Sequence, residues 1–354
     1  MQLNASDYLI FDEASGTYIE NPEQKVRDDV EKHHWGNVFK AIIKDWRLYL
    51  MLLPMIAVFL LWRYAPMYEL LECFKLPDEN KSVAQEFYIG FSNFKRLLFG
   101  SDSANFWNAF RNTFLLSFYG LLFGFPTPII VALFFNEIRS NVARSLYQVI
   151  TYLPKFMSTV VMTSLIIMLV SQANPTAEKD AGIVSQFLNM LGLISPEEMR
   201  AGLLNDPRFF RSIYQLSGIW EGAGYDSIVF FAAIIAISPT SYEAAQIDGA
   251  GKMAQMRYVV LPSILSTVVI MLITRIGSLL SVGYEKVYLL TDTGSNTGIY
   301  VTADVVSTYA LRLGINGTQK GLASAAEMMN NVVGMLLVIG ANTISRRASN
   351  VSLY

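Results

Sequence analysis

The sequence predicts an all-α integral membrane protein with six transmembrane helices, and three observations support this class. The chain of 354 residues is 53% hydrophobic and 16% charged, and its mean hydropathy is +0.35, which exceeds the apolar share of an ordinary soluble domain. Six apolar stretches are each long enough to cross a hydrocarbon core about 30 Å thick, which takes roughly 20 helical residues. These stretches are continuous, whereas the strands of a membrane barrel alternate in polarity over about ten residues.

The predicted elements follow in order along the chain. Residues 1–47 form a polar tail without the apolar core of a cleavable signal peptide, so the first span at 48–66 is expected to remain as an anchor. A loop at 67–111 separates this span from a block at 112–345, and residues 346–354 form a C-terminal tail. Within the block, the other five spans are expected at 112–135, 145–171, 213–237, 262–282 and 322–344.

The orientation of the chain follows from basic residues near the span ends, which concentrate on the cytoplasmic side. One side carries Lys25, Arg27, Lys32, Lys40, Lys44, Arg47, Arg139, Arg144, Lys252, Arg257, Arg346 and Arg347. The opposite side has the long loops 67–111 and 172–211, and long loops translocate with little regard for their charge. Both termini and the loop at 238–262 are therefore expected in the cytoplasm.

The loop at 238–262 is a polar interruption between two long apolar runs. Its first residues, serine and proline, suit an N-cap followed by proline in the first helical turn, and the next four residues fit a capping box. Glycines at 249 and 251 allow a sharp change of direction, and Pro262 suits the first turn of the next span. The loop therefore predicts two short helices that meet at an angle.

The spacing of residues in this loop is distinctive. Glu243, Ala244 and Ala245 are followed by three residues and Gly249, and after nine more residues by the run VVLP, residues 259–262. This spacing resembles the EAA loop of permease subunits in binding-protein-dependent ABC importers, and the fuller run EAAQIDGA resembles their carbohydrate branch. Glu-Ala-Ala alone is also a favourable helix sequence, but the spacing and the place between two spans argue against chance.

Other runs resemble the oligosaccharide and polysaccharide subgroup of this family, which includes alginate-type permeases. These are YLMLLPMIAVFLLWRYAPMY from Tyr49, GFSNFKRLLF from Gly90, RNTF from Arg111, GFPTPIIVALFFNEIR from Gly124, YLPKFMSTVV from Tyr152, WEGAGYDSIVFFAA from Trp220 and VGYEKVYLL from Val282. Two departures stand out. The second coupling helix of the family usually carries large aromatics where this chain has Met253 and Met256, and the subgroup often has a basic residue where Glu221 stands.

The resemblance implies a type I ABC importer permease fold, in which residues 238–262 form cytoplasmic coupling helices that sit in a groove on an ATPase. The residues implied for this coupling are Glu243, Ala244, Ala245, Asp248, Gly249, Met253, Met256, Leu261 and Pro262. The implied partners are a second related permease, two ATPase subunits and an extracytoplasmic solute-binding protein docked on the long loops. Such a complex works in the lipid of the bacterial cytoplasmic membrane, takes up an oligosaccharide or polysaccharide fragment by alternating access, and needs no nucleic acid.

The chain itself has no recognisable catalytic or metal motif. The run from Gly249 to Lys252 only superficially resembles a phosphate-binding loop, because position 246 is Gln and Met253 replaces the hydroxyl residue that would hold Mg²⁺. The only histidines, His33 and His34, have no cysteine or carboxylate cluster at metal-ligand spacing around them. No cofactor and no enzymatic activity are therefore expected here, and ATP and Mg²⁺ are expected on the partner ATPases.

Charged residues inside spans usually face protein or a water-filled cavity. Lys155 lies about ten residues into the third span, roughly 15 Å along a helix, and Arg275 lies about 20 Å into the fifth. Both are candidates for the substrate path, together with residues suited to hydrogen bonding or stacking with sugars: Trp220, Glu221, Tyr225, Tyr284 and Glu285.

Two other interpretations of these charges remain open. Lys155, Glu221, Asp226 and Arg275 also suit structural ion pairs, and Trp220 and Tyr284 also suit interfacial anchors. The same charges suit a proton or ion relay in a secondary transporter or channel, which would work without an ATPase. An intramembrane hydrolase is a weaker alternative, because no nucleophile has a base at suitable spacing.

Overall fold

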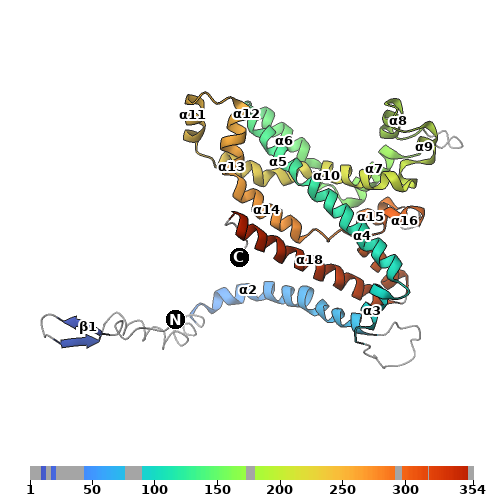
Figure 1. Cartoon of the computed structure of the whole chain (residues 1–354), viewed down its shortest axis with the longest axis horizontal. Coiled ribbons are helices and arrows are strands. Elements are labelled where there is room, and N and C mark those ends of the chain that lie inside the picture. Colours follow the sequence, from blue (N-terminus) through green and yellow to red (C-terminus); the bar gives the residue numbers. More distant parts are fainter. Residues whose placement is uncertain are drawn as a thin grey trace. The chain divides into compact units, whose positions relative to one another are not determined.

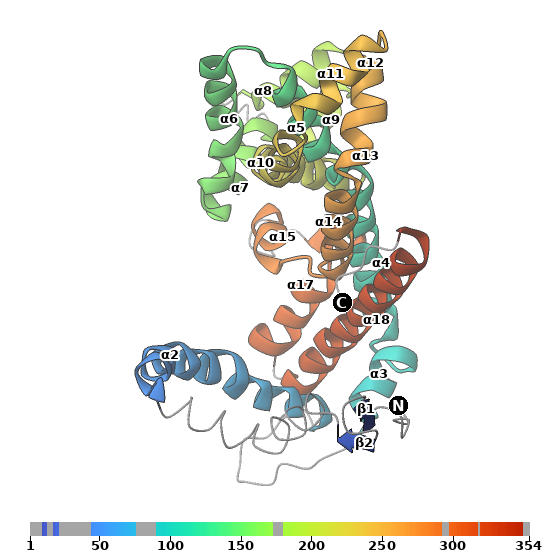
Figure 2. The same cartoon turned by 90° about the vertical axis from the view of Figure 1, so that its left-hand side faces the viewer.

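The structure, a computed structural model, describes residues 9–12, 17–20, 44–75, 90–172, 180–291, 297–317 and 319–349. The chain divides into two units, Met1–Tyr68 and Glu69–Tyr354. The described part is helical (Figure 1, Figure 2) except for one antiparallel hairpin in the predicted polar tail. This hairpin pairs β1 (Leu9–Asp12) with β2 (Thr17–Glu20), and the sequence had not predicted it.

Among the described residues, six helical segments are long and apolar enough to cross a membrane when each of two bent pairs counts as one. Four segments are continuous: Trp46–Phe74, Ser103–Glu137, Pro207–Ile235 and Lys320–Arg347. The bent pairs are Asn141–Phe156 with Thr159–Val170, at 101°, and Lys252–Ser263 with Leu265–Gly277, at 61°. Each predicted span overlaps one of these segments, which confirms the six-helix architecture. The third segment is broken inside the predicted span, whereas the fifth bends next to its predicted start at Pro262.

Wide π-helical turns interrupt three of these segments, and each ends two residues before a proline. The turns are η2 (Leu60–Tyr64), η4 (Gly120–Gly124) and η7 (Met256–Val260), and the prolines follow at 66, 126 and 262. Proline has no amide hydrogen for the carbonyl four residues earlier, and its ring crowds that carbonyl. That carbonyl belongs to the central residue of each wide turn, so the turns adapt the helices to their prolines.

The helices of the first two spans flank these turns. The first span comprises α2 (Trp46–Phe59) and the 3-10 segment η3 (Ala65–Phe74) on either side of η2. The second span comprises α4 (Ser103–Tyr119) and α5 (Pro126–Glu137) on either side of η4.

The break in the third span lies between α6 (Asn141–Phe156) and α7 (Thr159–Val170). Ser158 has extended backbone geometry, and its hydroxyl accepts a hydrogen bond from the Val161 amide at 3.4 Å, so a new helix starts there. α6 also crosses α10 (Pro207–Ile235) closely. A Cβ at Gly224 of α10 would lie 2.2 Å from the Thr151 carbonyl oxygen, so only glycine permits this crossing.

The remaining elements connect or extend the spans. They are α3 (Ser92–Phe99), α8 (Ile183–Met190), α9 (Pro196–Ala201), η6 (Leu203–Asn205), α11 (Pro239–Ile247), α12 (Lys252–Gln255), α13 (Leu261–Ser263), α14 (Leu265–Gly277), α15 (Tyr284–Leu290), η8 (Thr297–Ile299), α16 (Tyr300–Ala303), α17 (Val306–Leu311), η9 (Arg312–Asn316) and α18 (Lys320–Ser349). Within the second unit, α3, α8 and α9 lie at the opposite end from α11 and α12 (Figure 1).

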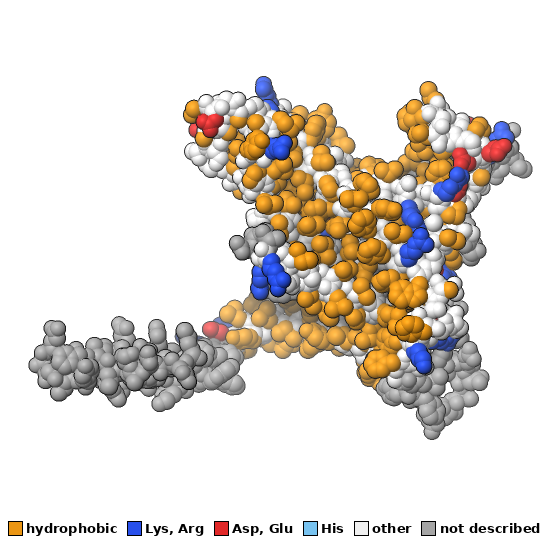
Figure 3. All heavy atoms as spheres, in the orientation of Figure 1, with side chains coloured by type: hydrophobic (Ala, Val, Ile, Leu, Met, Phe, Trp, Pro, Cys, Tyr) orange, Lys and Arg blue, Asp and Glu red, His pale blue; other side chains and the backbone are white. Residues whose placement is uncertain are grey.

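Large hydrophobic side chains are exposed along the spans, where Figure 3 shows them covering much of the visible surface. This pattern suits helices whose surrounding solvent is lipid. The interior is nevertheless closely packed. One cluster contains Ala132 of α5, Phe230 and Ile234 of α10, Val260 of η7 and Ile264. It joins two spans to the end of the loop at 238–262 and to the start of the segment that follows it.

Candidate functional site

The loop at 238–262 reverses direction through a Schellman turn centred on Gly249. α11 ends at Ile247, and Gly249 has φ +78°, a left-handed conformation that glycine adopts without steric cost. The Ala250 amide donates to the Ala245 carbonyl at 2.8 Å, and the Gly249 amide donates to the Gln246 carbonyl at 3.0 Å. These two bonds satisfy carbonyls at the helix end, so the predicted change of direction has a definite cause at Gly249.

The start of α11 differs in detail from the prediction. Ser238 occupies the N-cap position, and Pro239 is the first helical residue, as the sequence predicted. The Ser238 side chain makes no capping bond to the helix, and its hydroxyl lies 2.7 Å from the Thr240 hydroxyl instead. The second short helix runs from Lys252 through η7 to Ser263.

Three contacts attach this loop to the ends of the spans and stabilise its turn. The Tyr242 side chain packs against the cluster that joins α5, α10 and η7. Lys252 Nζ lies 2.9 Å from a Glu137 carboxylate oxygen at the end of α5. Gln255 is buried, and its side-chain amide donates to the Ala250 carbonyl at 2.8 Å. These contacts connect the loop with the ends of α5 and α10, so a displacement of the loop acts on both.

Three large side chains project from the loop without being covered by the rest of the chain. Ile247, Met253 and Tyr258 are 87%, 74% and 72% exposed, and we call them the loop's apolar surface. Ile247 and Tyr258 were not among the predicted coupling residues. In the sequence, each of the two is a large side chain next to a charged residue of the loop, Asp248 or Arg257.

The predicted coupling residues all lie in this loop, and most of them are accessible. Ala245 and Met256 are partly buried. The others are exposed: Glu243, Ala244, Asp248, Gly249, Met253, Leu261 and Pro262. The loop is therefore accessible to another protein over most of the segment that the sequence singled out.

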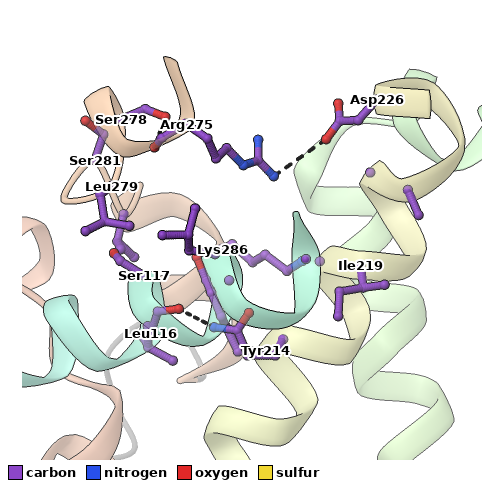
Figure 4. A pocket seen from close by; sticks show the side chains of 18 residues that line it. Leu116, Ser117, Tyr214, Ile219, Asp226, Arg275, Ser278, Leu279, Ser281 and Lys286 are labelled. Carbon is purple, nitrogen blue, oxygen red and sulfur yellow. Dashed lines mark hydrogen bonds and ion pairs between the residues drawn. The ribbon is translucent and has the colours of Figure 1, made fainter. Parts of the chain in front are cut away.

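A pocket of about 280 Å³ lies between α4, η4, α10, α15 and the segment that follows α14 (Figure 4). Glycines of η4 and α10 line part of it and leave space between the two helices. Its polar side chains carry hydroxyl, amide and charged groups: Ser117, Gln215, Asp226, Arg275, Ser278, Ser281 and Lys286. Such a lining is able to hydrogen-bond a polar ligand and to attract an anionic one.

Two ion pairs bring opposite charges together at this pocket. The Arg275 guanidinium of α14 points toward the Asp226 carboxylate of α10 (Figure 4), with 3.6 Å between the charged atoms. Lys286 Nζ of α15 lies 3.1 Å from a Glu221 carboxylate oxygen and 5.5 Å from the centre of the Tyr214 ring. The Arg275 side chain is 51% exposed, whereas that of Lys286 is 13% exposed. Arg275 therefore has the more accessible charge.

The structure brings some of the predicted path residues to this pocket and leaves others away from it. Arg275 lines the pocket, and Glu221 is linked to it through Lys286. The Tyr225 ring packs edge-on against Phe156, with 5.8 Å between ring centres. The exposed residues Trp220, Tyr284 and Glu285 are not part of the pocket lining.

Lys155 does not line the pocket. It lies near the end of α6, just before the 101° break, and the ten residues that lead to it form one continuous helix. Lys286 itself was not among the predicted path residues, although its neighbours Tyr284 and Glu285 were.

Among the described residues, no group of three or more His, Cys, Asp or Glu side chains is placed to hold a metal ion. His33 and His34 lie outside the described residues.

Comparison with known proteins relates both the loop and most of the pocket to one family. The family described as "Binding-protein-dependent transport system inner membrane component" matches residues 120–303. The polygalacturonan/rhamnogalacturonan transport system permease protein YteP of Bacillus subtilis (strain 168) is 33% identical over 88% of this chain and 92% of its own length.

Two solved structures are similar to this chain along most of its length. One is a bacterial ABC transporter involved in the import of the acidic polysaccharide alginate, with TM-score 0.76 and 40% identity over 88% of this chain and 99% of that chain. The other is a bacterial alginate ABC transporter in complex with an alginate pentasaccharide-bound periplasmic protein, with TM-score 0.75 and 39% identity over 89% and 99%.

Proposed function

This chain belongs to the family of binding-protein-dependent transport system inner membrane components, and from that membership we propose that it forms half of the translocation path of an ATP-driven glycan importer. Residues 238–262 couple it to separate ATPase subunits. The observation that carries the proposal is the loop's apolar surface, three exposed side chains beside a Schellman turn. Exposed apolar side chains of this kind suit a protein partner that buries them.

The connections of the loop explain how its movement would reach the pocket. α10 leads directly into α11, and α14 follows the second short helix after the 61° bend. These two helices carry the partners of one ion pair, Asp226 on α10 and Arg275 on α14. A displacement of the loop by the ATPases therefore changes the separation of Asp226 and Arg275, and with it the charge that the pocket presents to a substrate.

The proposed complex contains a second related permease, two ATPase subunits that bind ATP and Mg²⁺, and an extracytoplasmic solute-binding protein. The similar alginate transporter bound to a periplasmic protein supports the last of these partners. The chain spans the bacterial cytoplasmic membrane several times, with the loop and both termini in the cytoplasm. The substrate-binding protein would approach the opposite end, where α3, α8 and α9 lie.

The substrate is an oligosaccharide or polysaccharide fragment, and the pocket favours an acidic one. Arg275 and Lys286 line the pocket, where they pair with the carboxylates of Asp226 and Glu221. The Arg275 side chain is half-exposed, and its guanidinium lies 3.6 Å from the Asp226 carboxylate. A sugar carboxylate is therefore able to compete with Asp226 for Arg275. The relatives named for polygalacturonan and alginate transport handle uronate polymers, which supports the same substrate class.

The coupling role is tested by charging the loop's apolar surface in the assembled complex. Ile247→Asp combined with Tyr258→Asp should reduce both the amount of ATPase that co-purifies and glycan-stimulated ATP hydrolysis. Ser241→Asp is the matched control, because Ser241 is an exposed residue in the first turn of α11, where a carboxylate is favourable. Equal loss in the control, or no loss in the double variant, would argue against coupling through this surface.

The substrate class is tested by Arg275→Gln, which keeps a polar side chain but removes the charge. Hydrogen bonds to charged groups contribute about 1.5–3 kcal/mol, so the half-saturating concentration of a uronate oligosaccharide should rise about tenfold or more. The same oligosaccharide with its carboxylates reduced to alcohols is the control, and its response should not change. An equal shift for both glycans would show that Arg275 does not recognise the carboxylate.

A further inference from the structure

The short helix α8, between the third and fourth spans, exposes most of its large apolar side chains, although Leu188 packs inward. Ile183, Phe187 and Met190 lie on its exposed side, and Met190 is 84% exposed. Ser185 is 0% exposed and faces the interior. A soluble helix buries its apolar stripe and exposes its polar residues, so the exposed side of α8 does not suit contact with water.

The sequence around α8 separates apolar from charged residues sharply. From Ala181 to Pro196 the chain has no charged residue, and Leu191 and Leu193 extend the exposed apolar side past the end of the helix. The next helix, α9, carries two glutamates and an arginine. Figure 3 shows hydrophobic side chains gathered over α8 and charged side chains at the end of the same projection.

The start of α8 lies against a membrane-spanning helix. The Gly182 amide donates to the Ser171 carbonyl at 3.0 Å, which places the start of α8 against the end of α7. In the last turn of α7, Met168 is 72% exposed. Because α7 is the second half of the third span and is in contact with α8, α8 starts beside a membrane-spanning helix that also exposes an apolar side chain.

We propose that α8 lies in the boundary of the lipid bilayer at the end of the protein opposite the loop at 238–262, with Phe187 and Met190 inserted among the lipids. Amphipathic helices of this kind bury their apolar face at the level of the headgroups and upper acyl chains. Lipid covers such a face permanently. A binding protein that docks and leaves would expose the apolar face to water in every cycle, and transient protein contacts are more polar. The placement requires only that the chain spans a membrane, so it does not depend on coupling to an ATPase.

Spin labels on the full-length protein, in the purified complex and in lipid nanodiscs, test this placement. Labels are attached to Met190→Cys or Phe187→Cys, with the buried Cys73 replaced by serine, and collision rates are measured with oxygen and with a water-soluble nickel chelate. The control is Arg200→Cys on α9, an exposed position beyond the apolar side. Because these positions are exposed, the labels require no repacking of the interior, and the readout needs neither glycan nor ATP hydrolysis.

We expect labels at 187 and 190 to collide preferentially with oxygen, which concentrates in lipid, and the label at 200 to collide preferentially with the nickel chelate. Two results would overturn the proposal. Labels at 187 and 190 that are accessible to the nickel chelate until the binding protein is added would identify a docking surface for that protein. Labels shielded from both reagents would show that another subunit of the complex covers α8.

Discussion

Replacing Gly249 with alanine is expected to weaken coupling between the permease and its ATPase without removing any side-chain contact. Gly249 has φ +78°, and a left-handed conformation costs an L-residue about 1–2 kcal/mol. The added Cβ meets no atom within 4 Å, so this backbone cost is the whole effect. It corresponds to a shift of about 5- to 30-fold in the population of the native loop.

The assay is glycan-stimulated ATP hydrolysis by the assembled complex in lipid, together with the affinity of the ATPase for the permease. Gly251→Ala is the matched control, because Gly251 lies two residues away, has φ −70° and also has open space where the alanine methyl group would lie. Gly249→Asn is a second control, since asparagine tolerates the left-handed region better than alanine. We expect glycan-stimulated ATP hydrolysis and ATPase affinity to fall in Gly249→Ala, to recover partly in Gly249→Asn and to stay near normal in Gly251→Ala. Equal losses at 249 and 251 would show that the left-handed backbone at 249 is not the cause.

Three further predictions concern ion pairs. Lys286→Gln leaves the Glu221 carboxylate unpaired. Because the two side chains keep some exposure, 13% and 20%, we expect the free energy of unfolding to fall by an amount near the low end of about 3–5 kcal/mol. The double variant Lys286→Gln with Glu221→Gln should recover thermal stability, and no recovery would contradict the pairing. Lys252→Glu breaks an exposed pair and should cost at most about 1 kcal/mol, and adding Glu137→Lys should restore coupling if that pair positions the loop. The Ser195 backbone amide and then Arg208 hold the pKa of Glu198 below its ordinary value of 4.5. The ionised Glu198 carboxylate therefore stabilises the fold above pH 4.5, and this contribution is lost as the pH falls through the lower pKa of the folded state. Hydrogen-exchange protection of α9 should decline in acid in the native chain but not in Glu198→Ala.

The six spans were predictable because lipid requires long apolar helices, which appear in the sequence as long apolar runs. The same runs do not show where a helix bends. Pro154 and Ser158 lie inside an apolar run, and the extended backbone at Met157 and Ser158 turns the third span into two helices at 101°. The turn at Gly249 was predictable, because a glycine just after a helix end favours a left-handed cap whatever the tertiary contacts are.

The pocket was predictable only in part for a related reason. Arg275 was found because a charge inside an apolar run is unusual in itself. Lys286 pairs with Glu221 across 65 positions of the sequence, and that pairing depends on how α15 packs near α10. The exposure of Ile247 and Tyr258 likewise depends on the tertiary placement of the loop, since their residue types alone suit a buried core equally well.

Glycan uptake into proteoliposomes shows directly whether ATP on the side of the loop drives import. The complete complex is reconstituted with binding protein on one side, and ATP is supplied only on the side of the loop at 238–262. The proposed function predicts glycan accumulation that requires this ATP and that is lost in an assembled complex carrying Gly249→Asp. Accumulation driven by an ion gradient, by this chain without any ATPase subunit, would contradict the importer and favour a secondary transporter.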